Sequence, residues 1–355
     1  MKLGSLVSHS LFAVVPLAAL FAAPGCAIQP GDAEDTAQQA DGLKAAHAAA
    51  YTVDDAFATP GPFAVGHRGS GVNLGEDPTR PIENTIPAFR TGYKDGARMV
   101  ELDVQLTKDG DVVVYHDDFL ADYTCINTLT RDQLESAAPQ IPSLRAALAQ
   151  AAQFNRKSHD GSGLMMVELK PPSPMCDPGD TDDVVLAGAA VNVIAKAGMT
   201  HQVIVTSFSP TMLAAAAATQ PQVDRALDIN ALQLLPAELV QQYTGMPVTE
   251  ITKANGLGLR WAEVGPLYRL PGYSSINEFI GTAYYLGCYT TLMDRLVPLQ
   301  APDQAAALVQ GIHGLGMKSV VWTVNDAAEW QFFAAAGVDA IVTDDVPLGV
   351  SLQPN

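Results

Sequence analysis

Hydrophobic and polar positions follow two periods from about residue 57 to the end of the chain. Short runs of β-branched and apolar residues, some alternating with polar ones, predict strands. Longer segments with apolar residues three or four positions apart, several ending at glycine, predict helices. Besides a strand at 111–116, the expected strands are 63–67, 99–107, 164–170, 203–208, 225–229, 256–261, 318–324 and 339–345. The expected helices are 85–96, 142–154, 182–198, 209–219, 233–243, 303–316 and 326–337.

This order of elements predicts an α/β fold. Eight strands separated mostly by helices, over roughly 250–290 residues, are typical of a single (β/α)8 TIM barrel. An open doubly wound sheet is the alternative, and the lack of a Gly-rich dinucleotide loop after the first strand disfavours it. The segment 107–111, TKDGD, predicts a β-hairpin. Residues 262–300, rich in Tyr, Gly and Pro, are expected to be a loop insertion over the C-terminal mouth of the barrel.

The N-terminal residues differ in composition from the barrel domain, which is expected at 57–355. An apolar run at 11–23 is too short for a bilayer span, so 1–25 are expected to be a signal peptide. A core helix is the alternative, and Pro16 argues against it. Residues 26–56 contain few large apolar side chains and are expected to form a flexible tether.

Across the end of the signal peptide the sequence reads Ala-Ala-Pro-Gly-Cys at 22–26, which resembles a lipobox with Cys26 as the lipidated residue, although Ala23 stands where Leu is usual. Plain secretion, with cleavage after Ala23 or Ala27, is the alternative. Both alternatives predict a location in or beyond the bacterial cell envelope, either lipid-anchored or periplasmic and secreted.

The chain is acidic, with 20 Lys and Arg against 38 Asp and Glu, a net charge of −18. This charge argues against nucleic-acid binding and against electrostatic docking on anionic lipid. With 48% hydrophobic residues, the chain has enough apolar material for a large core. Because the net charge is negative, an anionic substrate would need local neutralisation by placed cations or a metal ion.

Polar residues stand at the C-terminal ends of the expected strands, where barrel enzymes carry their active sites. Each could have a structural role by itself, but their shared position at one end of the barrel predicts an active site. In chain order they are His67-Arg68-Gly69, Glu101 with Asp103, Glu168 with Lys170, Trp322 with Asn325, and Thr343-Asp344-Asp345.

Three of these residues predict a metal site. Glu101 and Asp103 lie two apart on a strand and so point to the same face. Two carboxylates this close repel each other, so either one is protonated or a cation lies between them. Glu168 on the next barrel strand completes an all-oxygen set that favours Ca²⁺ or Mg²⁺ over zinc. The alternative is an ion pair of Glu168 with Lys170 or Arg68.

The hairpin predicts a second histidine at this site. If Asp109 and Gly110 form a two-residue turn, Lys108 pairs with Asp111 and His116 lies opposite Asp103. A loop one residue longer would turn His116 to the other face.

These residues resemble the glycerophosphodiester phosphodiesterase family. The motifs, in family order and spread over nearly all of 62–347, are HRG at 67–69, ENT at 83–85, ELDVQLTKDGDVVVYHDD at 101–118, VELK at 167–170, WTVND at 322–326 and GVDAIVTDD at 337–345. The family is a (β/α)8 barrel. The resemblance implies that His67 and His116 are the acid/base pair. It implies that Glu101, Asp103 and Glu168 hold the metal, with Glu83 nearby. It also implies that Arg68 and Lys170 bind phosphate and that Trp322 is a wall of the substrate pocket. The long segments 69–82 and 262–300 depart from the family pattern and bear on the alcohol that is recognised.

The expected function is metal-dependent hydrolysis of glycerophosphodiesters to glycerol 3-phosphate and an alcohol, by histidine acid/base catalysis. A divalent metal with three carboxylates, Arg68 and Lys170 would carry a net charge of +1 toward the anionic diester. The alternatives are a phospholipase of the C or D type and a non-catalytic envelope binding lipoprotein. The expected partner is a small phosphodiester, with membrane contact through the N-terminal lipid anchor only and neither a nucleic-acid nor a protein partner.

The cysteines predict one disulfide. Cys125 follows the hairpin and Cys176 follows the VELK strand, so both are expected at the barrel mouth and in an oxidising compartment. Cys288 could replace either partner.

Overall fold

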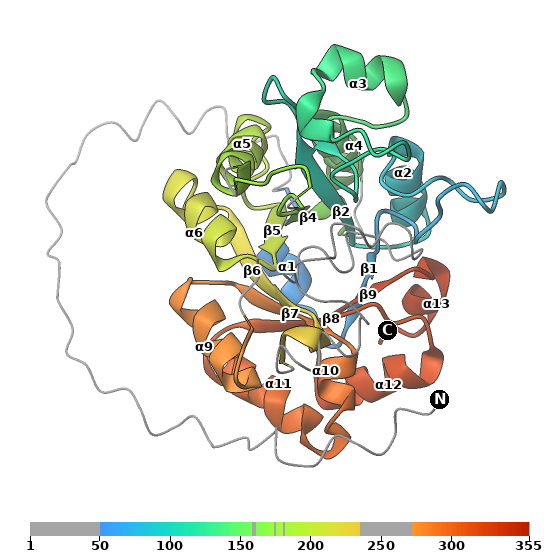
Figure 1. Cartoon of the computed structure of the whole chain (residues 1–355). Helices are drawn as coiled ribbons and strands as arrows, with labels where there is room; N and C mark the ends of the chain where they lie inside the picture. The colour runs from blue at the N-terminus through green and yellow to red at the C-terminus, as the bar shows by residue number, and fades with distance from the viewer. Residues whose placement is uncertain (1–49, 158–160, 174, 180–181, 235–271, 355) are drawn as a thin grey trace, which may run out of the picture.

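The computed structural model describes residues 50–157, 161–173, 175–179, 182–234 and 272–354 of the 355-residue chain. Its parallel strands close into a ring because β1 (Phe63–Gly66) pairs with both the next strand and the last one (Figure 1). The remaining barrel strands are β2 (Met99–Leu106), β4 (Leu164–Leu169), β5 (Val203–Ser207), β6 (Asp224–Ile229), β7 (Thr290–Asp294), β8 (Lys318–Trp322) and β9 (Ala340–Thr343). The predicted (β/α)8 barrel is confirmed.

Helices surround this ring (Figure 1). Several begin at a capping side chain just after a strand or loop, as at Ser209, which accepts from the backbone N–H of Met212, and at Asp326, which accepts from Ala328 and Glu329. The longer helices are α2 (Ile86–Lys94), α4 (Leu144–Lys157), α5 (Asp182–Lys196), α6 (Pro210–Thr219), α9 (Ile276–Tyr285), α11 (Ala305–Gly314) and α12 (Ala327–Ala336). The shorter ones are α1 (Val53–Phe57), α3 (Arg131–Ala137), α10 (Leu296–Leu299) and α13 (Val346–Ser351). Among the described helices, none has both the length and the apolar character needed to cross a bilayer.

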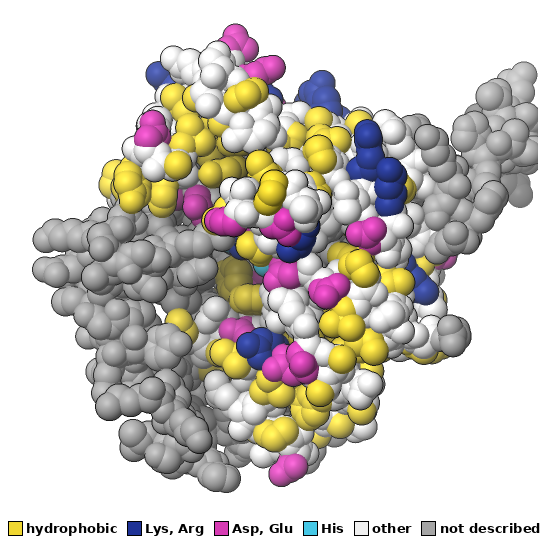
Figure 2. Space-filling view, turned by 90° about the vertical axis from the view of Figure 1, so that its right-hand side faces the viewer, with side chains coloured by type: hydrophobic (Ala, Val, Ile, Leu, Met, Phe, Trp, Pro, Cys, Tyr) yellow, Lys and Arg dark blue, Asp and Glu magenta, His cyan; other side chains and the backbone are white. Residues whose placement is uncertain are grey.

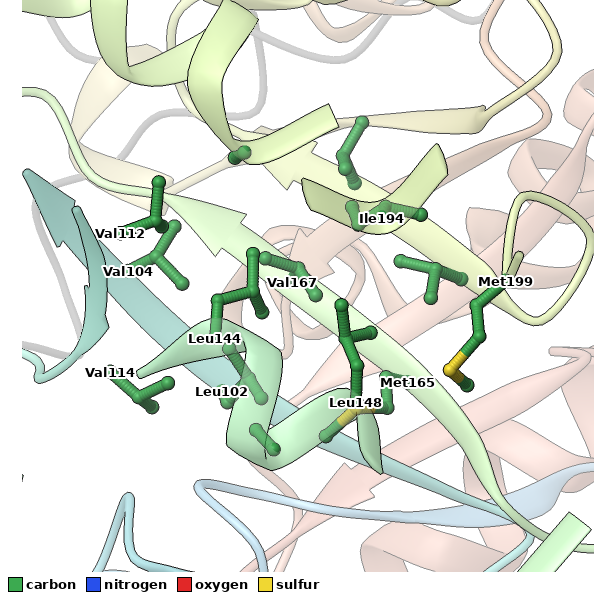
Figure 3. Close-up of a cluster of buried hydrophobic side chains, with 14 of the residues drawn as sticks. Leu102, Val104, Val112, Val114, Leu144, Leu148, Met165, Val167, Ile194 and Met199 are labelled. Carbon is green, nitrogen blue, oxygen red and sulfur yellow. The ribbon is translucent and has the colours of Figure 1, made fainter. Parts of the chain in front are cut away.

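Alternation along the strands divides the core into two layers. One set of side chains fills the inside of the barrel, including Val65, Met166, Ala226 and Val320. The opposite set packs under the helices, as Leu102, Val104, Met165 and Val167 do against α4 and α5 in Figure 3. Residues that continue the inner set beyond the last apolar layer therefore face the C-terminal mouth of the barrel.

The base of the barrel is covered by α1. Val53, Ala56 and Phe57 are buried, and the Phe57 ring lies 4.9 Å from that of Phe63 and 5.5 Å from that of Tyr289. The expectation that the tether extends to residue 56 is therefore wrong for 53–56, because these residues bury apolar side chains against the barrel. The signal peptide and tether residues 26–49 lie outside the described residues.

The seventh barrel strand is β7, and the prediction of residues 262–300 as an insertion is wrong for α9, β7 and α10. The strand expected at 256–261 and most of the helix expected at 233–243 lie outside the described residues. Strand β7 was missed because Thr290 and Thr291 are polar and interrupt the apolar run by which strands were predicted. Both are fully buried, and the Thr290 hydroxyl donates to the carbonyl of Lys318 at 2.9 Å.

The hairpin forms, but its register differs by one residue from the prediction. Val104 pairs with Val114 across β2 and β3 (Val112–Val114). Thr107 closes the turn by donating its N–H to the carbonyl of Asp111 at 2.9 Å, so the loop holds three residues. Gly110, at φ +84°, supplies the left-handed residue that such a loop requires.

Candidate active site

Three carboxylates meet at the barrel mouth. Asp103 on β2 is in register with Glu168 on β4, and Glu101 lies on the same face as Asp103. One oxygen from each of the three lies within 4.8 Å of the others. The sequence placed these residues together, and the structure brings them together.

The protonation of this triad reflects its crowding. Burial, together with the charges of Asp103 and Glu168, raises the pKa of Glu101 well above its usual range. Burial and the charge of Asp103 raise the pKa of Glu168 to about 7. The Oε1 atom of Glu101 is buried without a hydrogen-bond partner. An orphaned oxygen among crowded carboxylates fits a hard divalent cation, so these residues suit the metal that the sequence predicted.

Two cations lie beside the triad, so the ion-pair alternative is also present. The Lys170 Nζ atom is 2.8 Å from Glu168 Oε1 and 3.2 Å from Asp103 Oδ1. The Arg68 Nε atom is 3.5 Å from Asp103 Oδ2. Burial opposes ionisation of Asp103, but Lys170, His116 and Arg68 hold its pKa well below the usual range. Asp103 is therefore the most firmly ionised member of the triad.

Arg68 links the triad to Glu83. Its backbone N–H donates to Glu101 Oε2 at 2.8 Å, and its Nη1 donates to Glu83 Oε1 at 2.7 Å. Burial disfavours the guanidinium charge, but Asp103, Glu83 and Glu101 outweigh it and raise the pKa of Arg68. Glu83, which was expected near the metal, thus contacts Arg68, and it is not one of the three grouped carboxylates.

Sequence reasoning missed the role of Asn84. Its Nδ2 donates to Asp103 Oδ2 at 2.8 Å, while its Oδ1 accepts the Asp103 N–H at 3.2 Å. Asn84 has φ +57°, a conformation that Asn tolerates better than most residues. The ENT motif contained this residue, but its contact with β2 is visible only in the fold.

His67 is held from behind by Asp344. Its Nδ1 lies 2.8 Å from Asp344 Oδ1, and its Nε2 lies 4.0 Å from Glu101 Oε2. Burial alone would raise the pKa of Asp344, but hydrogen bonds from His67, Val72 and Asn325 hold it well below the usual range. A charged Asp344 accepts a hydrogen bond, so Nδ1 of His67 carries a proton and Nε2 faces the triad.

His116 reaches the same site despite the shifted register. Strand β3 ends at Val114 and its pairing with β2 continues to the Tyr115 N–H, which donates to the Asp103 carbonyl at 3.0 Å, so His116 lies beyond the alternation of faces. Its Nδ1 lies 2.7 Å from Asp117 Oδ1. Burial and the charges of Arg68 and Lys170 lower the pKa of His116 to about 3, so the ring is neutral at pH 7.

Trp322 lies at the end of β8 and contacts two residues that the sequence did not single out. Its Nε1 donates to Asp228 Oδ1 at 2.7 Å, and its ring centroid lies 5.8 Å from that of Phe208 at 90°. The signal for Asp228 was present in RALDI at 225–229, where it follows the inward-facing Ala226 by two positions. Figure 2 shows a face on which a histidine lies in a recess bordered by acidic, basic and hydrophobic side chains.

A disulfide joins two loops at the mouth. Cys125 and Cys176 are bonded, with a Cα–Cα distance of 5.5 Å, and the Cys288 thiol is free and buried. This is the pairing that the sequence favoured, with Cys288 as the excluded alternative. The Asn127 side chain also donates to the carbonyl of Cys176 at 2.8 Å, so the loop after the hairpin is held to the loop after β4.

Known proteins are similar to this chain in sequence. Residues 67–348 match the glycerophosphoryl diester phosphodiesterase family. The Bacillus subtilis protein YhdW is 27% identical over 297 residues, which cover 79% of this chain and 94% of the relative. A second Bacillus subtilis relative, a glycerophosphodiester phosphodiesterase, is 26% identical over 215 residues, or 55% of this chain and 66% of the relative.

Solved structures agree in fold. A glycerophosphodiester phosphodiesterase from Parabacteroides distasonis has a TM-score of 0.56 at 21% identity, covering 82% of this chain and 96% of that one. A phosphodiesterase from Oleispira antarctica, solved with its product sn-glycerol-3-phosphate, has a TM-score of 0.54 at 21% identity, covering 83% and 97%. Since the family match spans most of the chain and includes both histidines and all three grouped carboxylates, the protein belongs to the glycerophosphoryl diester phosphodiesterase family of enzymes.

Proposed function

We propose that this enzyme hydrolyses glycerophosphodiesters to glycerol 3-phosphate and an alcohol, with Ca²⁺ or Mg²⁺ held by Glu101, Asp103 and Glu168. The observation that carries the proposal is the convergence of three carboxylate oxygens within 4.8 Å at a mouth that also holds His67 and His116. Family membership supports the reaction class. The product bound to the Oleispira antarctica relative supports glycerol 3-phosphate as the product here.

The cations beside the triad offset the negative charge of the substrate. When bound, the divalent metal would act as a Lewis acid that offsets charge growing on the phosphoryl oxygens. Lys170 is 9% exposed at its side chain and lies between Asp103 and Glu168, so it contributes a fixed positive charge at the mouth. Arg68 is held by Glu83 and the triad, and its charge keeps Asp103 ionised and ready to bind the metal. Local charge thereby favours an anion in a protein of net charge −18.

The two histidines are proposed as the acid/base pair. The leaving alkoxide comes from an alcohol of pKa roughly 15 and needs a proton, while the attacking hydroxyl must lose one. Asp344 and Asp117 each hold one Nδ1, which fixes the orientation of each ring for proton transfer. The lowered pKa of His116 keeps its ring neutral, the form that can accept a proton, and we assign His67 as the donor.

The test is an assay of the purified protein with glycerophosphocholine and, separately, with phospholipid vesicles. Glycerol 3-phosphate should appear from glycerophosphocholine, stop after chelation, and return with Ca²⁺ or Mg²⁺. Glu168→Gln, which keeps the side-chain shape and removes the charge, should weaken metal affinity. Full activity after exhaustive chelation would reject the metal, and turnover of vesicles alone would favour a phospholipase instead.

A further inference from the structure

We propose that Asp228 is a positioning residue that fixes the indole of Trp322 as a wall of the substrate pocket and so sets substrate affinity. The proposal rests on the proposed function and on the expectation from the sequence that Trp322 is a wall of the substrate pocket. Asp228 carries no role in the chemistry described above, since it is not one of the three grouped carboxylates.

The contact joins strands that are distant in sequence. Trp322 ends β8 and Asp228 lies near the end of β6, 94 residues earlier, with β7 between the two strands. The Trp322 Nε1 atom donates to Asp228 Oδ1 at 2.7 Å, a short distance for an N–H···O bond. Asp228 is 3% exposed, whereas Trp322 is only partly buried. The buried carboxylate therefore holds the polar edge of an indole whose remaining surface reaches the mouth.

An apolar residue at position 228 would be less costly for stability. Ala226 precedes Asp228 on the same face and belongs to the apolar inner layer, which another apolar side chain would extend. Burying a carboxylate costs free energy unless hydrogen bonds compensate. The compensating donors here are the Trp322 indole N–H and the backbone N–H of Ile229, and of these two only the indole belongs to a side chain that the Asp228 carboxyl can orient.

Two contacts together define the indole position. Phe208 meets the Trp322 ring edge-on from beyond β5, with ring centroids 5.8 Å apart, and Asp228 fixes the Nε1 edge. Burial, and then the charge of Glu168, raise the pKa of Asp228 well above its usual range, so the Asp228 carboxyl lies within electrostatic reach of the triad. Without the acceptor, the indole can rotate about its two side-chain torsions, and the substrate would meet a less ordered wall. Since the wall does not touch the reacting atoms, the Michaelis constant should change more than turnover.

The kinetic experiment compares four variants of the full chain at saturating Ca²⁺ or Mg²⁺ with glycerophosphocholine. Asp228→Asn keeps an acceptor oxygen and should leave KM within about threefold. Asp228→Leu and Trp322→Phe each break the contact and should raise KM about tenfold or more, with kcat within about threefold, the effect expected when a buried polar group loses its hydrogen-bond partner. Adding Asp228→Leu to Trp322→Phe should change KM little further. Asp224→Asn, at the other end of β6, is the matched control and should leave KM unchanged.

A second readout does not depend on activity. In protein labelled with ¹⁵N at the tryptophan indole, Trp322→Phe identifies the Trp322 N–H signal by its loss. This signal should move or broaden in Asp228→Leu and remain sharp in Asp228→Asn. An indole signal that does not move in Asp228→Leu would overturn the proposal. An unchanged KM in Trp322→Phe would also overturn it, and this second comparison remains valid even if Asp228→Leu does not fold. If the wild-type protein hydrolyses no glycerophosphodiester, the proposed function fails, and the indole signal still decides whether Asp228 positions Trp322.

Discussion

His67 and His116 share one arrangement, in which an aspartate holds Nδ1 of each ring. Asp344 follows β9, 277 residues after His67, whereas Asp117 directly follows His116, so one brace is distant in sequence and the other is adjacent. An imidazole fixed at one nitrogen has a defined tautomer and a defined direction for the other nitrogen. Each histidine is therefore oriented before the substrate arrives.

Replacing either histidine should remove the acid/base pair as a unit. His67→Ala and His116→Ala should each lower turnover by about 10²–10⁴-fold, the usual range for general acid–base catalysis. The double variant should be little worse than the poorer single variant, because groups that act together are non-additive. The measurement is steady-state turnover at saturating metal.

The opposing possibility is that His116 only supports Asp103. Excess Ca²⁺ or Mg²⁺ would then restore the turnover of His116→Ala, and its loss would appear as weaker metal affinity. Recovery at high metal would remove His116 from the pair. A defect that persists at every metal concentration would keep it there.

Residues whose partners lie close in sequence, or at the expected strand ends, were predictable. Glu101, Asp103, Glu168 and His67 follow from spacing and from the barrel rule, whereas His116 was placed by a hairpin register that is one residue off in the structure. Asn84 and Asp228 were not assigned, because their partners lie 19 and 94 residues away and the contacts exist only after the ring closes.

Among the elements, seven of the eight barrel strands could be placed from hydrophobic pattern alone, and β7 could not. Its threonines are polar but fully buried, and the Thr290 hydroxyl donates to backbone carbonyls, so a pattern that assigns polar residues to the surface does not find this strand. The hairpin turn was placed correctly, but its length was not. A single left-handed glycine fits either a two- or a three-residue loop, and the Thr107 hydrogen bonds select the longer one.

The disulfide between the loops at the mouth should stabilise the whole domain. Cys125 and Cys176 are 51 residues apart, and closing a loop of that length in the unfolded chain is worth about 4 kcal/mol in the chain-entropy description. The double variant Cys125→Ser with Cys176→Ser should lower the free energy of unfolding by about 2–4 kcal/mol, measured by urea titration.

Reductant supplies the control for that experiment. It should lower the urea midpoint of the wild type toward that of the double variant and leave the double variant unchanged. A wild-type midpoint that is insensitive to reductant would contradict a stabilising bridge.

The contact between α1 and the barrel base predicts a pH dependence of stability. Burial, and then the charge of Asp54 on α1, raise the pKa of Asp224 at the start of β6 to about 6. Between about pH 4 and pH 6 the folded state therefore retains a proton that the unfolded state releases. The free energy of unfolding should fall as pH rises through this window.

Asp224→Asn removes that titration. Relative to wild type, the variant should gain a few degrees in Tm at pH 7 and show a smaller gain at pH 4. Thermal unfolding at the two pH values measures the difference, with the exposed Asp303→Asn as the control. An equal change at both pH values would show that Asp224 does not carry the effect.

At the scale of the whole molecule, an acidic protein surrounds a mouth that holds fixed cations. Such a body has little electrostatic attraction to anionic lipid, so membrane attachment needs another source. We propose that a lipid on Cys26 provides it and places the enzyme in the bacterial envelope.

Cys26→Ser should move the protein from the membrane fraction to the soluble fraction of the producing cells. Fractionation followed by immunodetection measures this, and Cys288→Ser serves as a control that alters a cysteine within the barrel. Membrane association that survives Cys26→Ser would refute the anchor.

The position of α1 has a practical consequence for anyone producing this enzyme. A recombinant chain cut at residue 57, where composition alone would place the start of the domain, loses Val53 and Ala56 and uncovers the apolar end of the barrel. A chain that begins at residue 50 keeps this cover and dispenses with everything upstream. The shorter version should therefore aggregate on purification, whereas the version seven residues longer should remain monodisperse.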